Sequence, residues 1–286
     1  MQLRQFLILC GVTSFASLAG RATLGSGGGN LVRPIGLTDE QRAILSHMEM
    51  VKVDNGAGES GMVLRISGVD LQLVNGSGAT GIANGTGNLI IGYNEADTPA
   101  DRTGSHNIVS GTNNGFTSTG GLVLGNGNEI EAPFAVALGG SWNRVTAPFG
   151  TVTGGQDNWA ARDFASISGG ASNFSFGIAS SISGGFENRA TGAFSAVSGG
   201  RNNEAAGAAS SVGGGGGYSL IDGNRASGPF ASIAGGSGNE ASGDHSGVGG
   251  GTGNLASGAG SAVSGGLMRA ATGPANWVAG ALEQTD

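Results

Sequence analysis

The chain carries little charge, and almost none of it comes from lysine. Only 12% of its 286 residues are charged, Lys52 is the single lysine, and the formal net charge is −7. Nucleic-acid-binding proteins carry a basic patch or stripe, which this composition does not supply. A lysine-poor, acidic chain is also poorly suited to electrostatic docking on anionic membranes. We therefore expect neither nucleic acid nor a membrane surface as its partner.

The residues that carry most enzyme chemistry are also scarce. Cys10 is the only cysteine, and the three histidines, His47, His106 and His245, lie far apart, so no Cys/His cluster has the spacing of a metal site. A serine hydroxyl without a nearby base is a poor nucleophile. The Gly-x-Gly runs follow strands but open no helix, so the dinucleotide-binding motif lacks its context. We expect a protein that is not an enzyme and binds no cofactor or metal.

Long apolar runs are missing too, and no segment beyond the N-terminus could span a bilayer. Near the N-terminus, Arg4 precedes a short apolar run at Phe6 to Cys10, and small residues follow at Ser17 and Ala19. This order is typical of a secretory signal peptide, which we place at residues 1–19. Because Cys10 lies inside it, the exported chain would hold no cysteine and no disulfide.

Glycine is abundant, with 60 residues. Glycine enrichment without a period suggests disorder, but here the glycines keep register with a recurring valine or isoleucine. The period is 15 residues over most of the chain, 14 near the start, with one step of 21 between Val212 and Ile233. The strand centres of this repeat are Ile90, Val109, Val123, Ala137, Val152, Ile167, Ile182, Val197, Val212, Ile233, Val248, Val263 and Val278.

Three further columns keep the same period. The first is an asparagine ladder: Asn114, Asn128, Asn143, Asn158, Asn173, Asn188, Asn203, Asn224, Asn239 and Asn254. Two residues later comes a small or apolar column from Ile130 to Ala271, which we interpret as a second inward-facing strand. The last holds phenylalanines: Phe134, Phe149, Phe164, Phe194 and Phe230. A fixed residue type in every coil implies a fixed environment along a stack. The pattern predicts an all-β solenoid, a narrow parallel β-roll of about 13 coils over residues 88–280.

The segments before the repeats differ in character. Residues 20–36 have the glycine and serine content of a flexible linker. Thr38 and Gln41 form a capping-box pattern that opens a helix over residues 37–51, whose apolar seam includes Ile44 and Met48. The helix either folds over the open first coil or forms a short coiled coil between chains. Residues 52–87 predict a β-strand cap, including an alternating strand through Val69, Leu71 and Leu73, and residues 281–286 a C-terminal tail.

Two loops interrupt the repeats, at residues 93–106 and 215–223. The second holds Tyr218 and Asp222. The first is the densest group of ionisable residues in the repeat region and our candidate binding loop; it contains Glu95, Asp97, Asp101, Arg102 and His106. Loops on rigid scaffolds often carry binding residues. The alternative is an ordinary surface loop held by a salt bridge such as Asp101 with Arg102. Calcium binding is disfavoured because the rungs carry Asn where the calcium repeat needs Asp.

The rungs Ser181–Gly185 with Asn188–Gly192, and Ser232–Gly236 with Asn239–Gly243, resemble the head repeats of trimeric autotransporter adhesins of the YadA-like type. The resemblance covers most of residues 88–280, although the period is one residue longer than is usual in that family. The block Asn88–Glu95 also resembles the start of uncharacterised secreted bacterial proteins with the same rungs. The resemblance implies a left-handed β-roll, a homotrimer, and secretion or exposure at a bacterial cell surface.

The sequence ends just past its last coil, without the stalk and barrel anchor of that family, so we expect secretion or attachment through a partner. The expected function is an adhesin-like module that binds a glycan or an extracellular protein. The alternative is a structural rod of a fibril, coat or matrix. Regular threonine or serine columns would be the sign of ice binding, and Thr151 with Thr153 on one rung is not a column. The phenylalanine column either fills the interior or forms a subunit interface at Phe149, Phe164 and Phe194, with Ile44 and Met48 as further interface residues.

Overall fold

The computed structural model describes residues 36–54, 60–97 and 100–280. The predicted signal peptide, the linker up to residue 35 and the tail at 281–286 lie outside these residues. The chain divides into two compact units, Met1–Leu71 and Gln72–Asp286. No helix within the described ranges is long and apolar enough to cross a membrane.

The first unit contains helix α2 (Asp39–Ser46) and an antiparallel hairpin of β1 (Met48–Asp54) and β2 (Ser60–Ile66). The capping box is present: the Gln41 backbone N–H donates to Thr38 Oγ1 at 3.2 Å, and the Thr38 N–H donates to Gln41 Oε1 at 2.9 Å. The predicted helix over residues 37–51 is wrong beyond Ser46. Residues from Met48 onward alternate along β1 and pair with β2, with Met48 opposite Ile66, and that pairing satisfies their backbone groups.

The predicted alternating strand through Val69, Leu71 and Leu73 is also wrong, because no strand occurs between residues 67 and 88. Within the described part of the chain, no strand pairs with the backbone of residues 67–88. Instead, Asn75 and Asn84 form Asx turns, in which Asn75 Oδ1 accepts from the Ser77 N–H at 3.0 Å and Asn84 Oδ1 from the Thr86 N–H at 3.1 Å.

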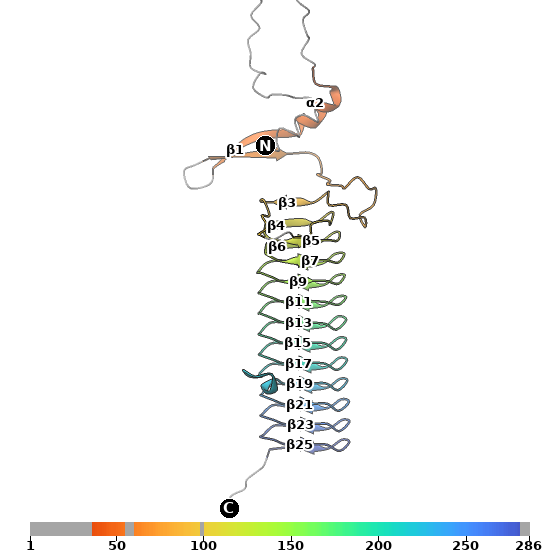
Figure 1. Ribbon diagram of the computed structural model, residues 1–286, viewed down its shortest axis with the longest axis vertical. Helices are drawn as coiled ribbons and strands as arrows, with labels where there is room; N and C mark the ends of the chain where they lie inside the picture. The colour runs from red at the N-terminus through yellow and green to blue at the C-terminus, as the bar shows by residue number, and fades with distance from the viewer. Residues whose placement is uncertain (1–35, 55–59, 98–99, 281–286) are drawn as a thin grey trace, which may run out of the picture. The chain divides into compact units, whose positions relative to one another are not determined.

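The second unit is a parallel β-solenoid of about 12 turns, close to the predicted number (Figure 1). Its strands form two sheets. The first sheet has 13 strands: β3 (Leu89–Ile91), β4 (Ile108–Thr112), β6 (Leu122–Asn126), β8 (Val136–Ala137), β10 (Thr151–Val152), β12 (Ser166–Ile167), β14 (Ser181–Ile182), β16 (Ala196–Val197), β18 (Ser211–Val212), β20 (Ser232–Ile233), β22 (Gly247–Val248), β24 (Ala262–Val263) and β26 (Trp277–Val278).

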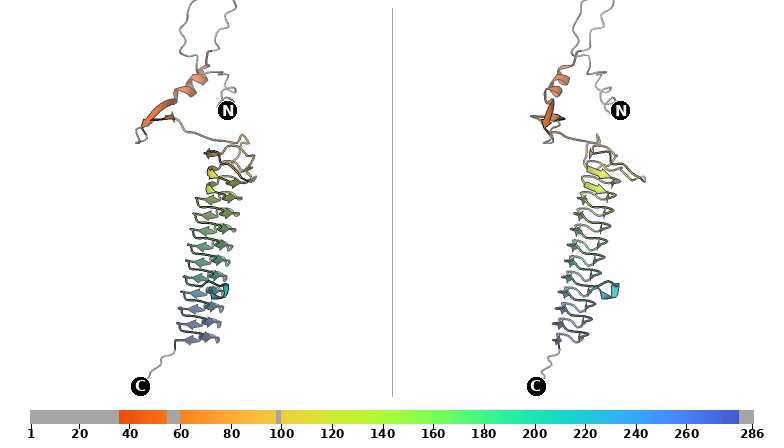
Figure 2. Two further views of the ribbon diagram at one scale, coloured as in Figure 1. Left: turned by 60° about the vertical axis from the view of Figure 1, so that its left-hand side comes forward. Right: turned by 90° about the vertical axis from the view of Figure 1, so that its left-hand side faces the viewer.

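The second sheet has 11 strands: β5 (Gly115–Phe116), β7 (Glu129–Ile130), β9 (Arg144–Val145), β11 (Trp159–Ala160), β13 (Phe174–Ser175), β15 (Arg189–Ala190), β17 (Glu204–Ala205), β19 (Arg225–Ala226), β21 (Glu240–Ala241), β23 (Leu255–Ala256) and β25 (Ala270–Ala271). Each strand pairs in parallel with its counterpart in the next coil, so that Ile167 lies beside Ile182 and Ser175 beside Ala190. Figure 2 shows the two sheets on opposite sides of the roll.

The core is one continuous column of small and β-branched side chains between the two sheets. The eight predicted core residues from Val152 to Val263 are at most 2% exposed, and the second sheet faces them with residues such as Ala160 and Ala190 at 0%. Burying one valine or isoleucine side chain contributes about 1.5–3 kcal/mol. Alanine opposite the larger residue keeps the two sheets close together, which makes the roll narrow.

The ladder asparagines are buried, and each joins its own coil to the next. At Asn173 the side-chain Nδ2 donates to Gly169 O at 3.1 Å in its own coil and to Gly185 O at 3.0 Å in the next. Its Oδ1 accepts from the Asn188 N–H at 3.0 Å. Because an unpaired buried backbone group is costly, each ladder residue stabilises the turn between two sheets.

One corner of the roll carries an unexpected backbone conformation. Phe149, Phe164 and Phe194 have φ of 57°, 60° and 59°, in the left-handed region that glycine adopts most readily. Their N–H groups donate across coils, Phe149 to Pro133 O at 3.2 Å and Phe194 to Ile178 O at 2.8 Å. These inter-coil bonds hold the strained corner and direct the rings outward. Glycine is required elsewhere: a Cβ on Gly192 would meet Gly207 O at 2.0 Å.

Candidate binding face

The outer surface of the second sheet carries a group of aromatic and arginine side chains. In each coil, the residue after the ladder asparagine points outward, the next points into the core, and the third points outward again. The outward residues therefore lie about 4.8 Å from their counterparts in neighbouring coils. We call the group formed here by Arg144, Trp159, Phe174, Phe176 and Arg189 the aromatic-arginine cluster.

In this cluster the ring of Phe176 contacts the rings of both Trp159 and Phe174. The centroids of Trp159 and Phe176 are 5.0 Å apart in an edge-to-face arrangement, and those of Phe174 and Phe176 are 5.7 Å apart. The Trp159 Nε1–H donates to Thr146 Oγ1 at 3.0 Å, which fixes the orientation of the indole. Contacts between rings of this kind contribute about 0.5–1.5 kcal/mol each beyond burial. All three rings remain partly exposed, so the cluster is a fixed apolar platform that solvent can reach.

An arginine lies at each end of the platform. The guanidinium carbon of Arg144 is 5.2 Å from the Trp159 ring centroid, and that of Arg189 is 5.8 Å from the Phe174 centroid. Arg144 also pairs with Glu131, Nη2 to Oε1 at 2.6 Å, and lies 3.5 Å from Glu129. The carboxylates hold Arg144 in place, whereas Arg189 makes no ion pair within the described ranges. The arrangement can stack a flat apolar group and offer charged donors at its edges.

A hollow of about 350 Å³ adjoins the Arg144 end of the platform. Its lining residues are Asp101, Gly115, Thr117, Glu129, Ile130, Glu131 and Arg144. The carboxylates accept hydrogen bonds and the guanidinium donates them, so the hollow suits a polar group rich in hydroxyls. The described residues contain no group of three or more His, Cys, Asp or Glu placed to hold a metal ion.

The candidate binding loop does not converge on one site. Asp101 lines the hollow, but its Oδ1 accepts from Thr103 Oγ1 at 2.8 Å, and Arg102 Nε donates to Asn114 O at 3.3 Å. The suggested Asp101 with Arg102 salt bridge is therefore wrong, because each side chain is turned to another partner. The other loop residues also hold local structure.

Within that loop, Asp97 Oδ2 accepts from Asn113 Nδ2 at 3.1 Å, and the Glu95 carbonyl accepts from the Asn113 N–H at 2.6 Å. His106 Nε2 accepts from the Asn75 N–H at 3.2 Å. The first two contacts join the loop to Asn113, after β4, and the third joins it to Asn75, before β3. Asp101 is the one candidate of the five that the structure places beside the binding face.

The phenylalanine column lies on the surface. Phe149, Phe164 and Phe194 are 49%, 58% and 67% exposed, which excludes the interior position left open above. The rings of Phe134 and Phe149 stack at 5.2 Å and those of Phe149 and Phe164 at 5.1 Å. We call this row the phenylalanine stripe. In the first unit, Ile44 is 63% exposed on α2, while Met48 begins β1, so the two do not share a helix face.

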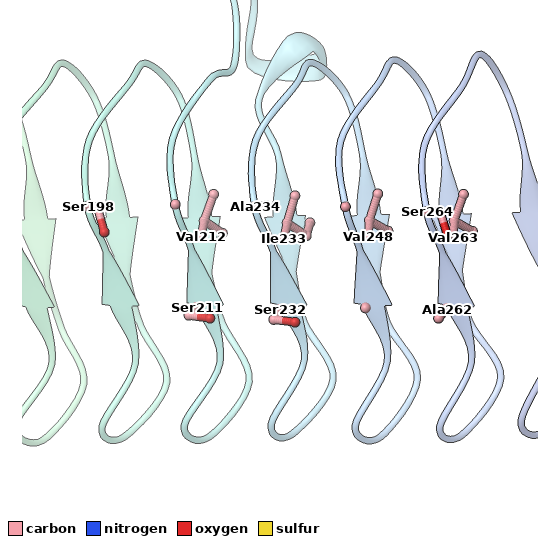
Figure 3. Close-up of a pocket in the computed structure, with 13 residues that line it drawn as sticks. Ser198, Ser211, Val212, Ser232, Ile233, Ala234, Val248, Ala262, Val263 and Ser264 are labelled. Carbon is pink, nitrogen blue, oxygen red and sulfur yellow. The ribbon is translucent and has the colours of Figure 1, made fainter. Parts of the chain in front are cut away.

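The first sheet has a different outer surface. A trough of about 500 Å³ lies along it, and its lining residues include Ser198, Ser211, Ser232 and Ser264, which are labelled in Figure 3. The other lining residues are serine, glycine, alanine, valine and isoleucine. Without a charged or aromatic group, this trough has little to select one ligand over another.

Sequence reasoning missed the aromatic-arginine cluster because its residues differ from coil to coil. The position after each ladder asparagine holds Glu, Arg, Trp, Phe, Arg and Glu in successive coils, and no column links them. The signal was the occurrence of two adjacent rungs with an aromatic residue at that position. No protein-family model matches the chain, and the comparison with curated proteins finds no match.

Proposed function

We propose that this chain is an exported, non-catalytic β-roll that acts as an adhesin-like binding module, secreted or held at a bacterial cell surface. The signal-peptide pattern supports export, and the YadA-like rungs support a role at the surface. One observation carries the binding role: the aromatic-arginine cluster holds three contacting, partly exposed rings on a solvent-facing sheet. Nothing in the fold requires large apolar groups there, since the same position holds glutamate in other coils.

The ligand that suits this face best is a glycan. The C–H face of a sugar ring is apolar and stacks on the negative face of an aromatic ring, while hydroxyls reach charged groups at its edge. The cluster supplies the aromatic rings, and the adjoining hollow supplies the charged groups. Together they extend across several coils. An extracellular protein with an extended polar segment is the other ligand class for this face.

Glycan-array binding of the chain from residue 20 tests the proposal, with the double variant Trp159→Ala/Phe174→Ala as the perturbation. We expect the variant to lose at least about tenfold in affinity, since each stacked ring contributes on the order of 1 kcal/mol or more. Trp277→Ala is the matched control, because Trp277 is an exposed tryptophan on the first sheet. Unchanged binding in the double variant would reject this face as the site.

A structural rod is the second candidate, and the phenylalanine stripe is the observation that favours it. A row of stacked, half-exposed rings is an uncommon solvent surface and is typical of an interface. A second copy of the same roll carries the same spacing between rings, so two or three rolls could pack along it, as the trimer implied by the YadA-like resemblance requires.

Light scattering coupled to size exclusion measures this directly on the chain from residue 20. We expect an oligomer, with a trimer supporting the adhesin-head arrangement, and a smaller mass for Phe149→Ser/Phe164→Ser/Phe194→Ser with little change in melting temperature. A monomeric wild-type chain would contradict the stripe as an interface.

A further inference from the structure

A second surface feature stands apart from the binding face, where one coil is longer than the others. Between Val212 and Ile233 the step is 21 residues rather than 15, and the extra residues form a bulge with the short 3₁₀ helix η2 (Leu220–Asp222). The bulge projects from the side of the roll in Figures 1 and 2. Because the strands on either side keep their register, the roll does not need these residues.

The bulge is anchored at both ends. Asn202 Nδ2 donates to Gly217 O at 2.8 Å in the preceding coil, and the Gly238 N–H donates to Asp222 O at 2.8 Å in the following one. Inside the bulge, the Ser219 N–H donates to Asp222 Oδ2 at 3.2 Å. A loop held in this way presents its side chains in a fixed geometry, which lowers the cost of ordering on binding.

The anchored bulge places Tyr218 over an arginine of the roll. The Arg201 guanidinium carbon lies 4.9 Å from the Tyr218 ring centroid and 4.5 Å from that of Phe186. Phe186, Arg201 and Gly216 follow one another in a column of parallel bridges. Gly216 leaves the space above Arg201 without a side chain, and the bulge supplies Tyr218 as the second ring.

The Arg201 guanidinium makes no ion pair and no hydrogen bond within the described parts of the chain, and its Nε is buried without a partner. Arg144 and Arg225, by contrast, pair with glutamates. The rings of Phe186 and Tyr218 both contact the Arg201 guanidinium. The chain that carries this cation has a net charge of −7. A planar guanidinium of this kind binds a carboxylate through two parallel N–H donors.

Tyr218 adds a flat apolar surface beside this charge. Tyr218 is 91% exposed although it contacts Arg201, so most of its ring is open to solvent, and Ile221 is 85% exposed. A single ring beside a single cation matches one acidic sugar unit in size. A peptide would instead add its backbone to an unpaired strand edge, and β17 is paired on both sides here, with β15 and β19.

We propose that the Arg201 and Tyr218 pair is a binding site for an acidic saccharide, with its carboxylate on the Arg201 guanidinium and its sugar ring stacked on Tyr218. The site shares no residue with the aromatic-arginine cluster, so it does not depend on the ligand of that face.

The test is calorimetric titration of the chain from residue 20 with two carboxylated probes, a short oligogalacturonate and sialyllactose, and with the neutral methyl ester of the oligogalacturonate. We expect at least one carboxylated probe to bind, and binding to weaken as salt rises. Arg201→Gln and Tyr218→Ala should each reduce its affinity by about tenfold or more. Arg162→Gln removes the same charge from an exposed arginine and should leave binding unchanged.

Failure of both carboxylated probes to bind would overturn the proposal, as would equal binding of the methyl ester or an Arg162→Gln loss equal to that of Arg201→Gln. Polyglutamate that binds as tightly, with no effect of Tyr218→Ala, would overturn the saccharide assignment in favour of an acidic peptide. Far-UV circular dichroism of each variant establishes that the roll is folded. The double variant Trp159→Ala/Phe174→Ala should keep this binding, which separates the present proposal from that for the second sheet.

Discussion

Replacing Asn173 by alanine tests whether the asparagine ladder is a main source of stability. The substitution removes the Nδ2 bonds to Gly169 O and Gly185 O and leaves the Asn188 N–H without the acceptor that it has at 3.0 Å. Each lost hydrogen bond costs about 0.5–1.5 kcal/mol, and a buried unpaired donor costs about 1–3 kcal/mol. The expected loss of unfolding free energy is therefore about 2–6 kcal/mol.

Urea unfolding followed by far-UV circular dichroism measures this loss, and Gln156→Ala is the matched control. Gln156 is an exposed amide whose side chain bonds, among the described residues, only to the adjacent Asp157, at 3.1 Å, so its removal should change stability by less than about 0.5 kcal/mol. If Asn173→Ala were as stable as the control, the ladder would be a consequence of the fold and not a cause of its stability.

Two further pairs of substitutions, each a test with its control, probe the close approach of the coils and the packing of the core. Gly192→Ala should destabilise the roll by several kcal/mol, since its Cβ would meet Gly207 O at 2.0 Å, whereas Gly184→Ala, with no atom within 4 Å, should have little effect on the melting temperature. Ile182→Ala should cost about 2–5 kcal/mol in urea unfolding, because Ile182 is 1% exposed. Ile178→Ala, at a position 51% exposed, should cost under about 1 kcal/mol, and equal losses at the two isoleucines would contradict the assignment of inside and outside.

The roll was predictable from sequence because its contacts repeat. A residue that meets its counterpart one coil away is constrained in every coil, so valine, asparagine and glycine recur as columns that are visible without a structure. The end of α2 was not predictable in this way. The spacing of Met48 and Val51 fits a helical seam, and the alternation of Met48 with Met50 fits a strand equally well. The pairing of β1 with β2, about fifteen residues away, decides between them.

The outward groups were harder to predict because neighbours on the surface come from different coils. Trp159 and Phe176 are 17 positions apart in sequence, and their ring contact at 5.0 Å depends on the rise of the stack. The direction of the phenylalanine stripe depended on a backbone conformation, since a positive φ at Phe164 turns its ring outward. A column in the sequence shows that an environment is constant, but it does not show whether that environment is core or solvent.

The separation between repeating and non-repeating positions indicates where function lies in this fold. The residues that recur in every coil stabilise the roll, and a substitution at one of them alters the contacts with the two neighbouring coils. Positions that vary from coil to coil carry no such constraint, and the fold tolerates glutamate, arginine or tryptophan at the same place. Arg201, Tyr218 and Trp159 all stand at positions where the repeat does not dictate the residue. Neither the core nor the ladder accounts for a guanidinium between two rings or for three contacting, partly exposed rings, and these groups are the basis on which we propose binding.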